Sequence, residues 1–296
     1  MSPNSNHLLD IDPDLNYYPA ENMNENLNYY TVDEYSSVIS EEINLLKIMS
    51  VNIRSLAKNG IELKVLLETI SNKPDLLVVT ETWLIESDLN EVYVEGFSAF
   101  HSTRPTGRGG GVSLFYRESL ECIKCDAISC VDESIEICSV RVKLSKCFHI
   151  LAIYRPHSGS IAAFTDSLEI ILNNSEIHNS NICLMGDFNA NILNENCVQS
   201  SNLTQLLSSY HFVSLINSPT RFSSISNPSL LDQCWLNSFD YKSSGVILYN
   251  LTDHCPIFAN LDFRSPVTTN PIKTVRFRLV DEMSFQNFVI KLCDIP

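Results

Sequence analysis

Short apolar runs rich in β-branched residues alternate with helical patterns between residues 47 and 263. Runs of this length and composition are typical of strands that are buried on one or both faces. The expected strands are residues 47–53, 76–79, 112–116, 135–142, 148–154, 181–185 and a half-buried closing strand at 257–263. Apolar side chains spaced three and four positions apart predict helices around residues 63–70, 164–172 and 203–210. This order of elements predicts an α/β fold.

Composition divides the chain into three parts. Residues 1–46 are acidic and rich in Asn, and they lack sustained periodicity, so they predict a mostly disordered leader. Residues 47–263 form the predicted folded domain. Residues 264–296 contain Pro266 and Pro271 and then one apolar helical face, which predicts a linker and an amphipathic helix at the start of a missing downstream region.

The net charge depends on which part of the chain is counted. The whole chain has 35 acidic and 20 basic residues, and its formal charge is −15. Nine of those carboxylates, and no Lys or Arg, lie in residues 1–46, so the remaining chain has 26 acidic and 20 basic residues and a charge of −6. A nucleic-acid partner is therefore compatible with the folded part, although phosphate binding requires local basic residues.

Targeting and membrane signals are absent from the sequence. No run of about eighteen apolar residues exists, which is the length that a membrane-spanning helix needs. The first residues have neither the positive start nor the apolar segment of a secretory signal. We expect a protein that is not secreted, has no membrane partner and is made in the cytoplasm.

Two residue patterns that resemble known ligand sites lack their essential parts. Cys122 and Cys125 form a single C-x-x-C, and without a second pair the ten cysteines predict free, mostly buried thiols. The glycine-rich segment 107–111 lacks the Gly-Lys-Ser/Thr ending of a nucleotide-binding loop. It predicts a tight entry to the next strand, with Arg104 and Arg108 available to a nucleic-acid backbone.

Five apolar runs end in polar groups that can bind a metal ion, a phosphate or a proton. These groups are Asn52, Glu81, Tyr154, the segment 186–189 and the segment 252–254. Since strand ends at the rim of a packed sheet hold reactive groups rigidly, we expect them to form one site. Mg²⁺ prefers oxygen ligands and keeps several waters, so Glu81 with Asn52 is the predicted metal-binding pair.

Seven segments together resemble the endonuclease/exonuclease/phosphatase superfamily, which has the fold of deoxyribonuclease I and of apurinic endonucleases. They are SVNIRSL (50–56), TETWL (80–84), GGGVSLF (109–115), IYRP (153–156), GDFN (186–189), LDQCW (231–235) and TDHCP (252–256). They occur in the same order as in the family, and their residues are most similar to those of the endonuclease domain of non-LTR (LINE-type) retrotransposons. The resemblance implies a two-sheet β-sandwich flanked by helices, in the four-layer arrangement of deoxyribonuclease I.

The resemblance also implies catalytic roles. Asp187 would orient or deprotonate the attacking water, and Asn189 would donate a hydrogen bond on the phosphate side. His254 would present an N–H to the phosphate, with Asp232 as the carboxylate that keeps its pKa raised. Tyr154 would add a further hydrogen bond to the phosphate.

The sequence says less about the role of Asp253 and about which residues bind substrate. Asp253 is adjacent to His254 and points to the other face of an extended segment, so the resemblance places it towards the metal. The loop 218–229, which includes Arg221, resembles the segment that contacts target DNA in these endonucleases. Arg54 and His157 depart from the pattern of many relatives. The expected substrate-binding residues are Arg155, His157, Thr252, Arg221, Arg104 and Arg108.

The activity that the resemblance implies is a Mg²⁺-dependent phosphodiesterase, with Mn²⁺ as a substitute, that nicks DNA and leaves 3′-hydroxyl and 5′-phosphate ends. In a retrotransposon such a nick primes reverse transcription in the nucleus, so a downstream reverse transcriptase region is expected in the parent polyprotein. Two alternatives stay open. One is a phosphatase for inositol phosphates, or a sphingomyelinase, of the same fold. The other is a non-catalytic nucleic-acid-binding remnant of a decayed element.

Overall fold

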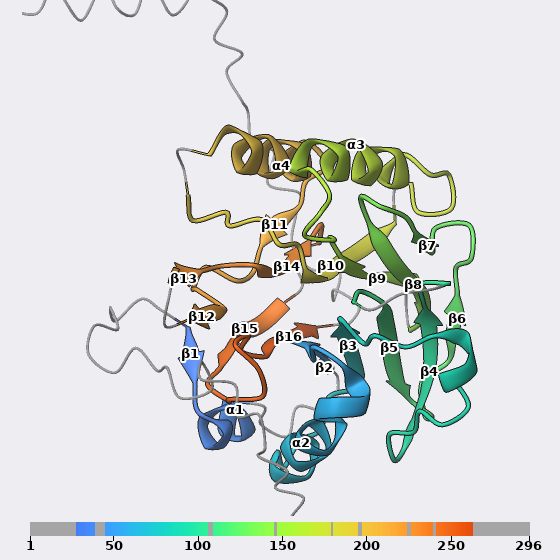
Figure 1. The fold of residues 1–296 in the computed structure, drawn as a ribbon, viewed down its shortest axis with the longest axis vertical. Helices are drawn as coiled ribbons and strands as arrows, with labels where there is room; N and C mark the ends of the chain where they lie inside the picture. Colours follow the sequence, from blue (N-terminus) through green and yellow to red (C-terminus); the bar gives the residue numbers. More distant parts are fainter. Residues whose placement is uncertain are drawn as a thin grey trace, which may run out of the picture. The chain divides into compact units, whose positions relative to one another are not determined.

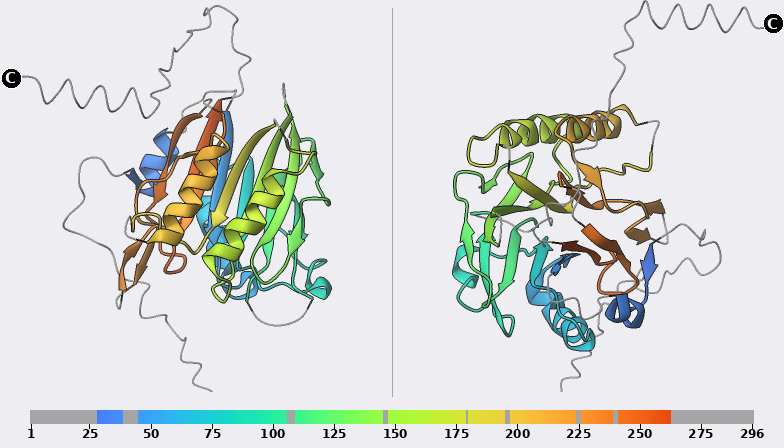
Figure 2. Two further views of the ribbon diagram at one scale, coloured as in Figure 1. Left: turned by 90° about the horizontal axis from the view of Figure 1, so that it is seen from above. Right: turned by 180° about the vertical axis from the view of Figure 1, so that it is seen from behind.

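The described residues form two large sheets and four α-helices (Figures 1 and 2). The computed structural model of the chain describes residues 28–38, 45–105, 109–144, 147–178, 180–194, 197–223, 226–238 and 241–262. None of the helices in this described part combines the length and apolar character that a membrane span needs.

The first sheet has the strand order β1-β15-β16-β2-β3-β5-β4. Its strands are β1 (Tyr29–Tyr30), β2 (Leu45–Asn52), β3 (Leu76–Thr80), β4 (Phe97–Ser102), β5 (Val112–Arg117), β15 (Tyr241–Ile247) and β16 (Ile257–Asp262). β2 and β3 run parallel to each other, whereas β16 pairs with β2 in the antiparallel direction. Parallel pairing of β2 and β3 brings their carboxyl ends to the same edge.

The second sheet has the order β11-β14-β10-β9-β8-β6, and β7 also pairs with β8. Its strands are β6 (Cys122–Lys124), β7 (Cys130–Val131), β8 (Glu136–Lys143), β9 (Cys147–Tyr154), β10 (Asn181–Asp187), β11 (Val213–Ser214) and β14 (Asp232–Leu236). β9 and β10 are parallel, so their carboxyl ends also share an edge. A separate hairpin consists of β12 (Arg221–Ser223) and β13 (Ser226–Ser229).

Helices cover the outer face of each sheet and make a four-layer arrangement. They are α1 (Val32–Val38), α2 (Leu56–Thr69), α3 (Ile161–Leu172) and α4 (Val198–Ser209), and a short 3₁₀ helix, η2, spans Glu86–Asp88. Figure 1 shows α3 and α4 side by side over the second sheet, with α1 and α2 on the far side of the first. This is the predicted two-sheet α/β sandwich flanked by helices, and that prediction is confirmed.

Alternation along each strand divides the apolar side chains between three cores. On β2, Ile48 faces the core between the sheets, whereas Met49 packs under α2 with Leu66. On β9, Ile150 faces the same central core, whereas Leu151 packs against the layer of α3 and α4. Each sheet is therefore buried on both faces, which explains why its strands appear in the sequence as nearly continuous apolar runs.

All seven predicted strands and all three predicted helices exist, with ends that differ by a few residues. Two expectations are wrong. The closing strand, β16, is buried along almost its whole length because it lies between β15 and β2 and is covered on both faces. The polar loop 218–229 is not irregular, because β12 and β13 form a hairpin within it.

The predicted leader is also wrong in part, because residues 28–38 belong to the folded domain. Tyr29 and Tyr30 pair in parallel with Val246 and Ile247 of β15. Tyr35 on α1 is fully buried and its ring meets Phe258 edge-on at a centroid distance of 4.8 Å. The remaining leader residues, 1–27 and 39–44, and the predicted linker and helix at 264–296 lie outside the described residues.

Tyr35→Ala should lower the free energy of unfolding by about 3–5 kcal/mol, because it empties a large, fully buried site. Tyr35→Phe is the matched control: the buried hydroxyl has no hydrogen-bond partner among the described residues, so its removal should be neutral or slightly stabilising. Urea unfolding of both variants measures the difference. Equal stability of wild type and Tyr35→Ala would show that α1 does not unfold together with the rest of the domain.

The described cysteines are all free thiols, as predicted, and five of them are buried. The glycine run also has its predicted role as an entry to a strand. Gly111 has a φ of 85° immediately before β5, and Thr82 and Trp83 donate backbone hydrogen bonds to Gly111 and Gly110. The run therefore holds the segment after β3 in place.

Candidate active site

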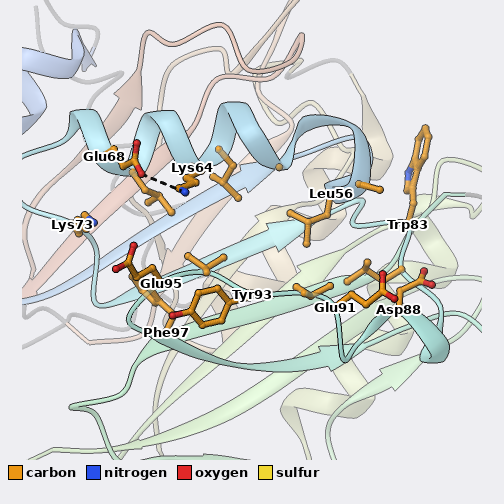
Figure 3. A pocket seen from close by; sticks show the side chains of 17 residues that line it. Leu56, Lys64, Glu68, Lys73, Trp83, Asp88, Glu91, Tyr93, Glu95 and Phe97 are labelled. Carbon is orange, nitrogen blue, oxygen red and sulfur yellow. Dashed lines mark ion pairs between the residues drawn. The ribbon is translucent and has the colours of Figure 1, made fainter.

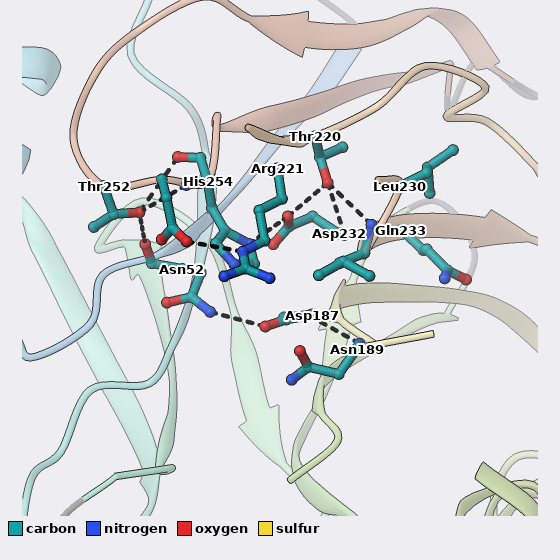
Figure 4. Close-up of polar contacts among 12 residues, drawn as sticks. Asn52, Asp187, Asn189, Thr220, Arg221, Leu230, Asp232, Gln233, Thr252 and His254 are labelled. Atoms are coloured by element: carbon teal, nitrogen blue, oxygen red, sulfur yellow. Dashed lines mark hydrogen bonds and ion pairs between the residues drawn. The ribbon is translucent and has the colours of Figure 1, made fainter. Parts of the chain in front are cut away.

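Polar side chains from both sheets meet at the edge where the parallel pairs end (Figure 4). Asn52 is the last residue of β2 and pairs in register with Thr80 of β3. Asp187 is the last residue of β10 and lies opposite Tyr154 of β9 on one side and Asp232 of β14 on the other. The Nδ2 atom of Asn52 donates to Oδ2 of Asp187 at 2.8 Å, and this bond joins the two sheets.

Glu81 belongs to the same network. Asn52 Nδ2 also donates to Glu81 Oε1 at 2.9 Å, and the indole Nε1 of Trp83 donates to Glu81 Oε2 at 3.3 Å. Glu81 and Trp83 have φ values of 52° and 57°, a region that side chains other than glycine rarely adopt. Backbone held in such a conformation is common at functional sites, where surrounding contacts impose it.

Surrounding backbone hydrogen bonds impose this conformation on Glu81. Ser55 and Leu56 donate to the carbonyls of Glu81 and Thr82 at 2.8 and 3.0 Å. On the other side, Trp83 donates to Gly110 at 2.9 Å. The start of α2 and the glycine run thus hold the Glu81 segment from both sides.

Asp187 is fully buried, and its environment changes its titration. Burial raises the pKa of Asp187, the nearby Asp232 raises it further, and His254 and the N–H of Asn189 only partly oppose this, so the pKa is about 7. Asn189 donates its backbone N–H to Asp187 Oδ1 at 2.9 Å. A carboxylate with this pKa is suited to accept a proton at neutral pH.

Asp232 and His254 form the predicted pair. His254 Nδ1 and Asp232 Oδ2 are 2.7 Å apart, and Thr220 donates its hydroxyl to the same carboxylate oxygen at 2.7 Å. Burial lowers the pKa of His254, but the charge and hydrogen bond of Asp232, together with the charges of Asp187 and Asp253, outweigh it and raise the pKa to about 9. His254 therefore carries a proton at neutral pH.

This histidine makes stability depend on pH. A folded-state pKa of about 9, against an ordinary value of 6.5, gives a contribution that is complete below pH 6.5 and is lost as the pH rises through 9. Urea unfolding should show a loss of about 2 kcal/mol between pH 7 and 9. His254→Gln should flatten this slope, whereas the exposed His178→Gln should keep it; parallel slopes in all three proteins would contradict the assignment.

Asp253 was expected to face the metal ion, and in the structure its carboxylate is paired with two arginines. Its Oδ1 accepts from Nη1 of Arg54 and its Oδ2 accepts from Nε of Arg221, both at 2.8 Å. Burial raises the pKa of Asp253, but His254, Arg221 and Arg54 outweigh it and hold the pKa below its ordinary value. Both carboxylate oxygens thus bind arginines.

Two predicted substrate-binding residues, Arg155 and Thr252, make side-chain hydrogen bonds to the backbone of this chain. Arg155 is buried, and its guanidinium donates to the backbone carbonyls of Phe188, Pro156, Gly159 and Asn189. These bonds hold the turn that follows β10, and the predicted contact of Arg155 with substrate stays a prediction.

Thr252 uses its hydroxyl in the same way. It donates to the carbonyl of Asn52 at 3.0 Å and accepts from the backbone N–H of His254 at 3.1 Å. The side chain therefore ties the His254 segment to the end of β2, and its predicted contact with substrate stays a prediction.

Arg104 is paired with a buried carboxylate that the sequence analysis missed. Its Nε lies 2.6 Å from Oε1 of Glu136, and Gly111 donates its N–H to Oε2 at 2.5 Å. Glu136 is fully buried and lies opposite Tyr154 in register. Arg104 thus contacts Glu136, and its predicted contact with a nucleic-acid backbone stays a prediction. Arg108 lies outside the described residues.

Tyr154 and His157 both lie beside the cluster. Burial raises the pKa of Tyr154, and the charges of Glu81 and Asp187 raise it further, so its hydroxyl stays protonated and can donate. His157 is exposed, and burial of part of its ring lowers its pKa, as do Arg155 and Arg221, against the opposing charge of Glu81. Their predicted roles towards a phosphate stay predictions.

The end of β10 requires glycine at position 186. Gly186 has a φ of 145°, and a Cβ there would overlap the carbonyl oxygen of Ile153. Asn189, with a φ of 47°, donates its side-chain Nδ2 to the carbonyl of Arg155 at 2.8 Å. This close packing sets the direction of the Asp187 carboxylate.

Two sets of side chains could hold a metal ion. Asp187, Asp232 and His254 each offer a ligand atom within 4.8 Å of the others. Glu81 offers a carboxylate close to Asp187, and Asn52 donates its Nδ2 to both acids while its amide oxygen accepts from the backbone N–H of Arg54. A histidine ligand must be unprotonated, whereas His254 shares a proton with Asp232, so the Glu81 carboxylate is the better fit for a hard cation.

The residues that the sequence analysis missed had different signals. Glu136 is a single carboxylate between Ile135 and Ile137 in an apolar run, a pattern that indicates a partnered buried acid. Trp83 stands within the TETWL segment but was given no role. Thr220 lies in a polar loop among several hydroxyl residues, where nothing in the sequence distinguishes it.

A groove of about 520 Å³ lies apart from this cluster, between α2 and the segment that leads to β4 (Figure 3). Leu63, Leu67 and Phe97 line its apolar floor, and Trp83 stands at one end. The charged residues along it are mostly acidic: Glu68, Asp88, Glu91 and Glu95 against Lys64 and Lys73. This charge does not favour a nucleic-acid backbone.

Residues 49–254 match the sequence profile of the Endonuclease/Exonuclease/phosphatase family. Among curated proteins, none has a sequence that matches this chain significantly. The matched range includes every member of the clustered set described above, from Asn52 to His254.

Solved structures with a similar fold include two endonucleases. The AP endonuclease LMAP from Leishmania major has a TM-score of 0.62 and 16% identity, covering 75% of this chain and 89% of that one. The endonuclease domain of TRAS1, a telomere-specific non-LTR retrotransposon, has a TM-score of 0.58 and 13% identity, covering 74% and 98%. The Xenopus laevis APE2 catalytic domain gives 0.57 and 16%, covering 74% and 94%. Identities this low show the fold alone.

Proposed function

Because this chain belongs to the endonuclease/exonuclease/phosphatase family, whose members are hydrolases and mostly metal-dependent nucleases and phosphatases, we propose that it is a divalent-metal-dependent phosphodiesterase that nicks DNA. One observation carries the proposal. The hydrogen bonds from Asn52 to Asp187 and between His254 and Asp232 bring the edge of the first sheet, with Asn52, Glu81 and His254, against Asp187 and Asp232 of the second. A phosphodiester bound there would meet all of these groups at once.

Glu81 and Asn52 would hold the metal ion, which we propose to be Mg²⁺, with Mn²⁺ as a substitute. The carboxylate of Glu81 supplies oxygen, the ligand atom that hard divalent cations prefer, and Asn52 would bind through its amide oxygen, which accepts from the backbone N–H of Arg54 in this structure. When bound, the ion would supply positive charge to offset the negative charge that develops on the phosphate. The remaining chemistry can be assigned to side chains of this protein.

Asp187 is the proposed base. It would take a proton from water while the water oxygen forms a bond to phosphorus and the bond from phosphorus to O3′ breaks. The departing O3′ would take up a proton from solvent, which leaves 3′-hydroxyl and 5′-phosphate ends. Its pKa of about 7 makes the ionised form available at neutral pH. His254, protonated and held by Asp232, would donate an N–H to the phosphate as its charge grows.

The biological role that we propose is target nicking for a non-LTR retrotransposon, which would take place in the nucleus. The support is the set of seven segments and the likeness of fold to the TRAS1 endonuclease domain. Under this proposal the new 3′-hydroxyl primes reverse transcription by a polymerase region of the parent polyprotein. The DNA partner is part of the same proposal.

The products of the reaction test this function. Supercoiled plasmid incubated with the protein and Mg²⁺ should give nicks that DNA polymerase extends without further treatment, because each nick carries a 3′-hydroxyl. Release of inorganic phosphate from inositol phosphates, or of phosphocholine from sphingomyelin, with intact plasmid would establish one of the same-fold alternatives instead. DNA binding without any of these products would favour the non-catalytic remnant.

A further inference from the structure

The contact between Asp253 and two arginines has no place in the roles assigned so far. Arg54 follows β2 and Arg221 begins β12, so the two residues come from distant parts of the chain. Each donates to a different oxygen of Asp253 at 2.8 Å. The Asp253 side chain is 2% exposed, whereas those of Arg54 and Arg221 are 41% and 30% exposed. A buried anion thus fixes two cations that reach the surface.

The position of this set relates it to the catalytic cluster. Arg54 donates its backbone N–H to Oδ1 of Asn52 at 3.2 Å, and Arg221 forms an isolated β-bridge with His254. Figure 4 shows Arg221 next to His254 and Asp232. The two arginines therefore stand beside the groups to which we assign metal binding and proton donation.

The charges and geometry suit a phosphate group. Two guanidinium groups and one carboxylate leave a net positive charge, in a folded part whose overall charge is negative. Guanidinium groups present several N–H donors in a planar fork that matches phosphate oxygens. Because Asp253 holds both side chains in place, little side-chain freedom would be lost when a phosphate binds.

We propose that Arg54 and Arg221 form a clamp for a backbone phosphate of the DNA strand that is cut, and that Asp253 is a positioning residue for the two arginines rather than a metal ligand. This inference rests on the proposed function. Arg221 was expected to bind substrate, whereas Arg54 and the positioning role of Asp253 were not expected.

The clamp can be tested by DNA binding without cleavage. The full chain is titrated against a fluorescently labelled DNA duplex in EDTA at several salt concentrations. Arg54→Ala and Arg221→Ala should each raise the dissociation constant about tenfold and reduce the salt dependence by about one phosphate contact. Lys143→Ala is the matched control, because it also removes one cation. Lys143 lies at the end of β8 that is opposite to Glu136, away from the catalytic cluster, so this variant should bind DNA as wild type does. Equal binding by all four proteins would overturn the clamp.

Asp253→Asn tests the positioning role, because it keeps the shape of the side chain but removes its charge. It should weaken DNA binding in EDTA, and adding Arg54→Ala to it should weaken binding by less than the two separate effects combined, since both act on one clamp. The Mg²⁺ concentration for half-maximal nicking should stay that of wild type. A large rise in this concentration, with unchanged binding in EDTA, would make Asp253 a metal ligand and overturn its assignment.

Failure of the clamp and failure of the proposed function give different results. If wild type nicks plasmid while Arg54→Ala and Arg221→Ala bind DNA normally, the clamp is wrong and the function stands. If wild type binds DNA with the predicted dependence on both arginines but cuts nothing, the clamp stands and the catalytic proposal fails. Thermal unfolding of each variant identifies any loss of binding that comes from misfolding.

Discussion

His254→Gln should lower the rate of plasmid nicking by about 10³-fold, within the range that a positioned acid or base contributes. Glutamine can donate a hydrogen bond, but it cannot carry the positive charge that Asp232 stabilises on the ring of His254. Initial rates of open-circle formation at saturating Mg²⁺ measure the effect. The loss should appear at neutral pH, where the wild-type histidine, with a pKa of about 9, is protonated.

The matched control for this change is His178→Gln, which alters an exposed histidine on the turn after α3. It should nick plasmid at the wild-type rate. If His254→Gln and His178→Gln nick equally fast, the histidine is not part of the reaction. Asp232→Asn should resemble His254→Gln, because the carboxylate that raises the pKa of the ring is lost.

Glu81→Gln is expected to cause a second loss on the order of 10³-fold, since the charge that would hold the metal ion is removed while the shape is kept. Unlike the histidine variant, it should also raise the Mg²⁺ concentration needed for half-maximal rate. The measurement is the nicking rate over a Mg²⁺ titration. Glu86→Gln, an exposed carboxylate on η2, is the control and should leave the titration unchanged.

A Glu81→Gln variant that keeps the wild-type rate and Mg²⁺ requirement would remove Glu81 from the metal site. The cluster of Asp187, Asp232 and His254 would then be the remaining place for an ion in the described part of the chain. That outcome would reverse the roles proposed for the two halves of the cluster.

Strand ends were the part of the site that the sequence could predict. An apolar run shows where a strand lies, and the first polar residue after it shows where the strand leaves the core. Asn52, Glu81 and Asp187 follow this rule, and all three are joined by hydrogen bonds. The pairing of His254 with Asp232 came from the resemblance, and the structure places the two side chains in contact.

The order of strands within a sheet could not be predicted from these patterns. β16 places the polar residues Asn260 and Asp262 on one face, around Leu261, and so resembles a strand with that face exposed. It is buried because β15 and β2 flank it and because Tyr35, from the supposed leader, covers Phe258. Burial of a polar position depends on what other segments cover it, and a short aromatic segment in an acidic region gives little periodic signal.

The partners of charged side chains were also beyond the sequence. Arg155, Arg104 and Asp253 were assigned to substrate or metal because of their place in a motif. Arg155 binds backbone carbonyls, which every residue has and no sequence pattern reveals. Arg104 and Asp253 meet partners that are 32 residues away or more, so their pairing requires the three-dimensional fold.

Conversion of supercoiled plasmid by the full chain, with Mg²⁺ and with EDTA, tests most directly whether this edge of the two sheets is one hydrolytic centre. The expected result is open circles with Mg²⁺, none with EDTA, and almost none with either Glu81→Gln or His254→Gln, which alter the proposed metal ligand and the proposed phosphate donor. Plasmid that stays supercoiled with wild type, or that is nicked equally by wild type and both variants, would contradict the account.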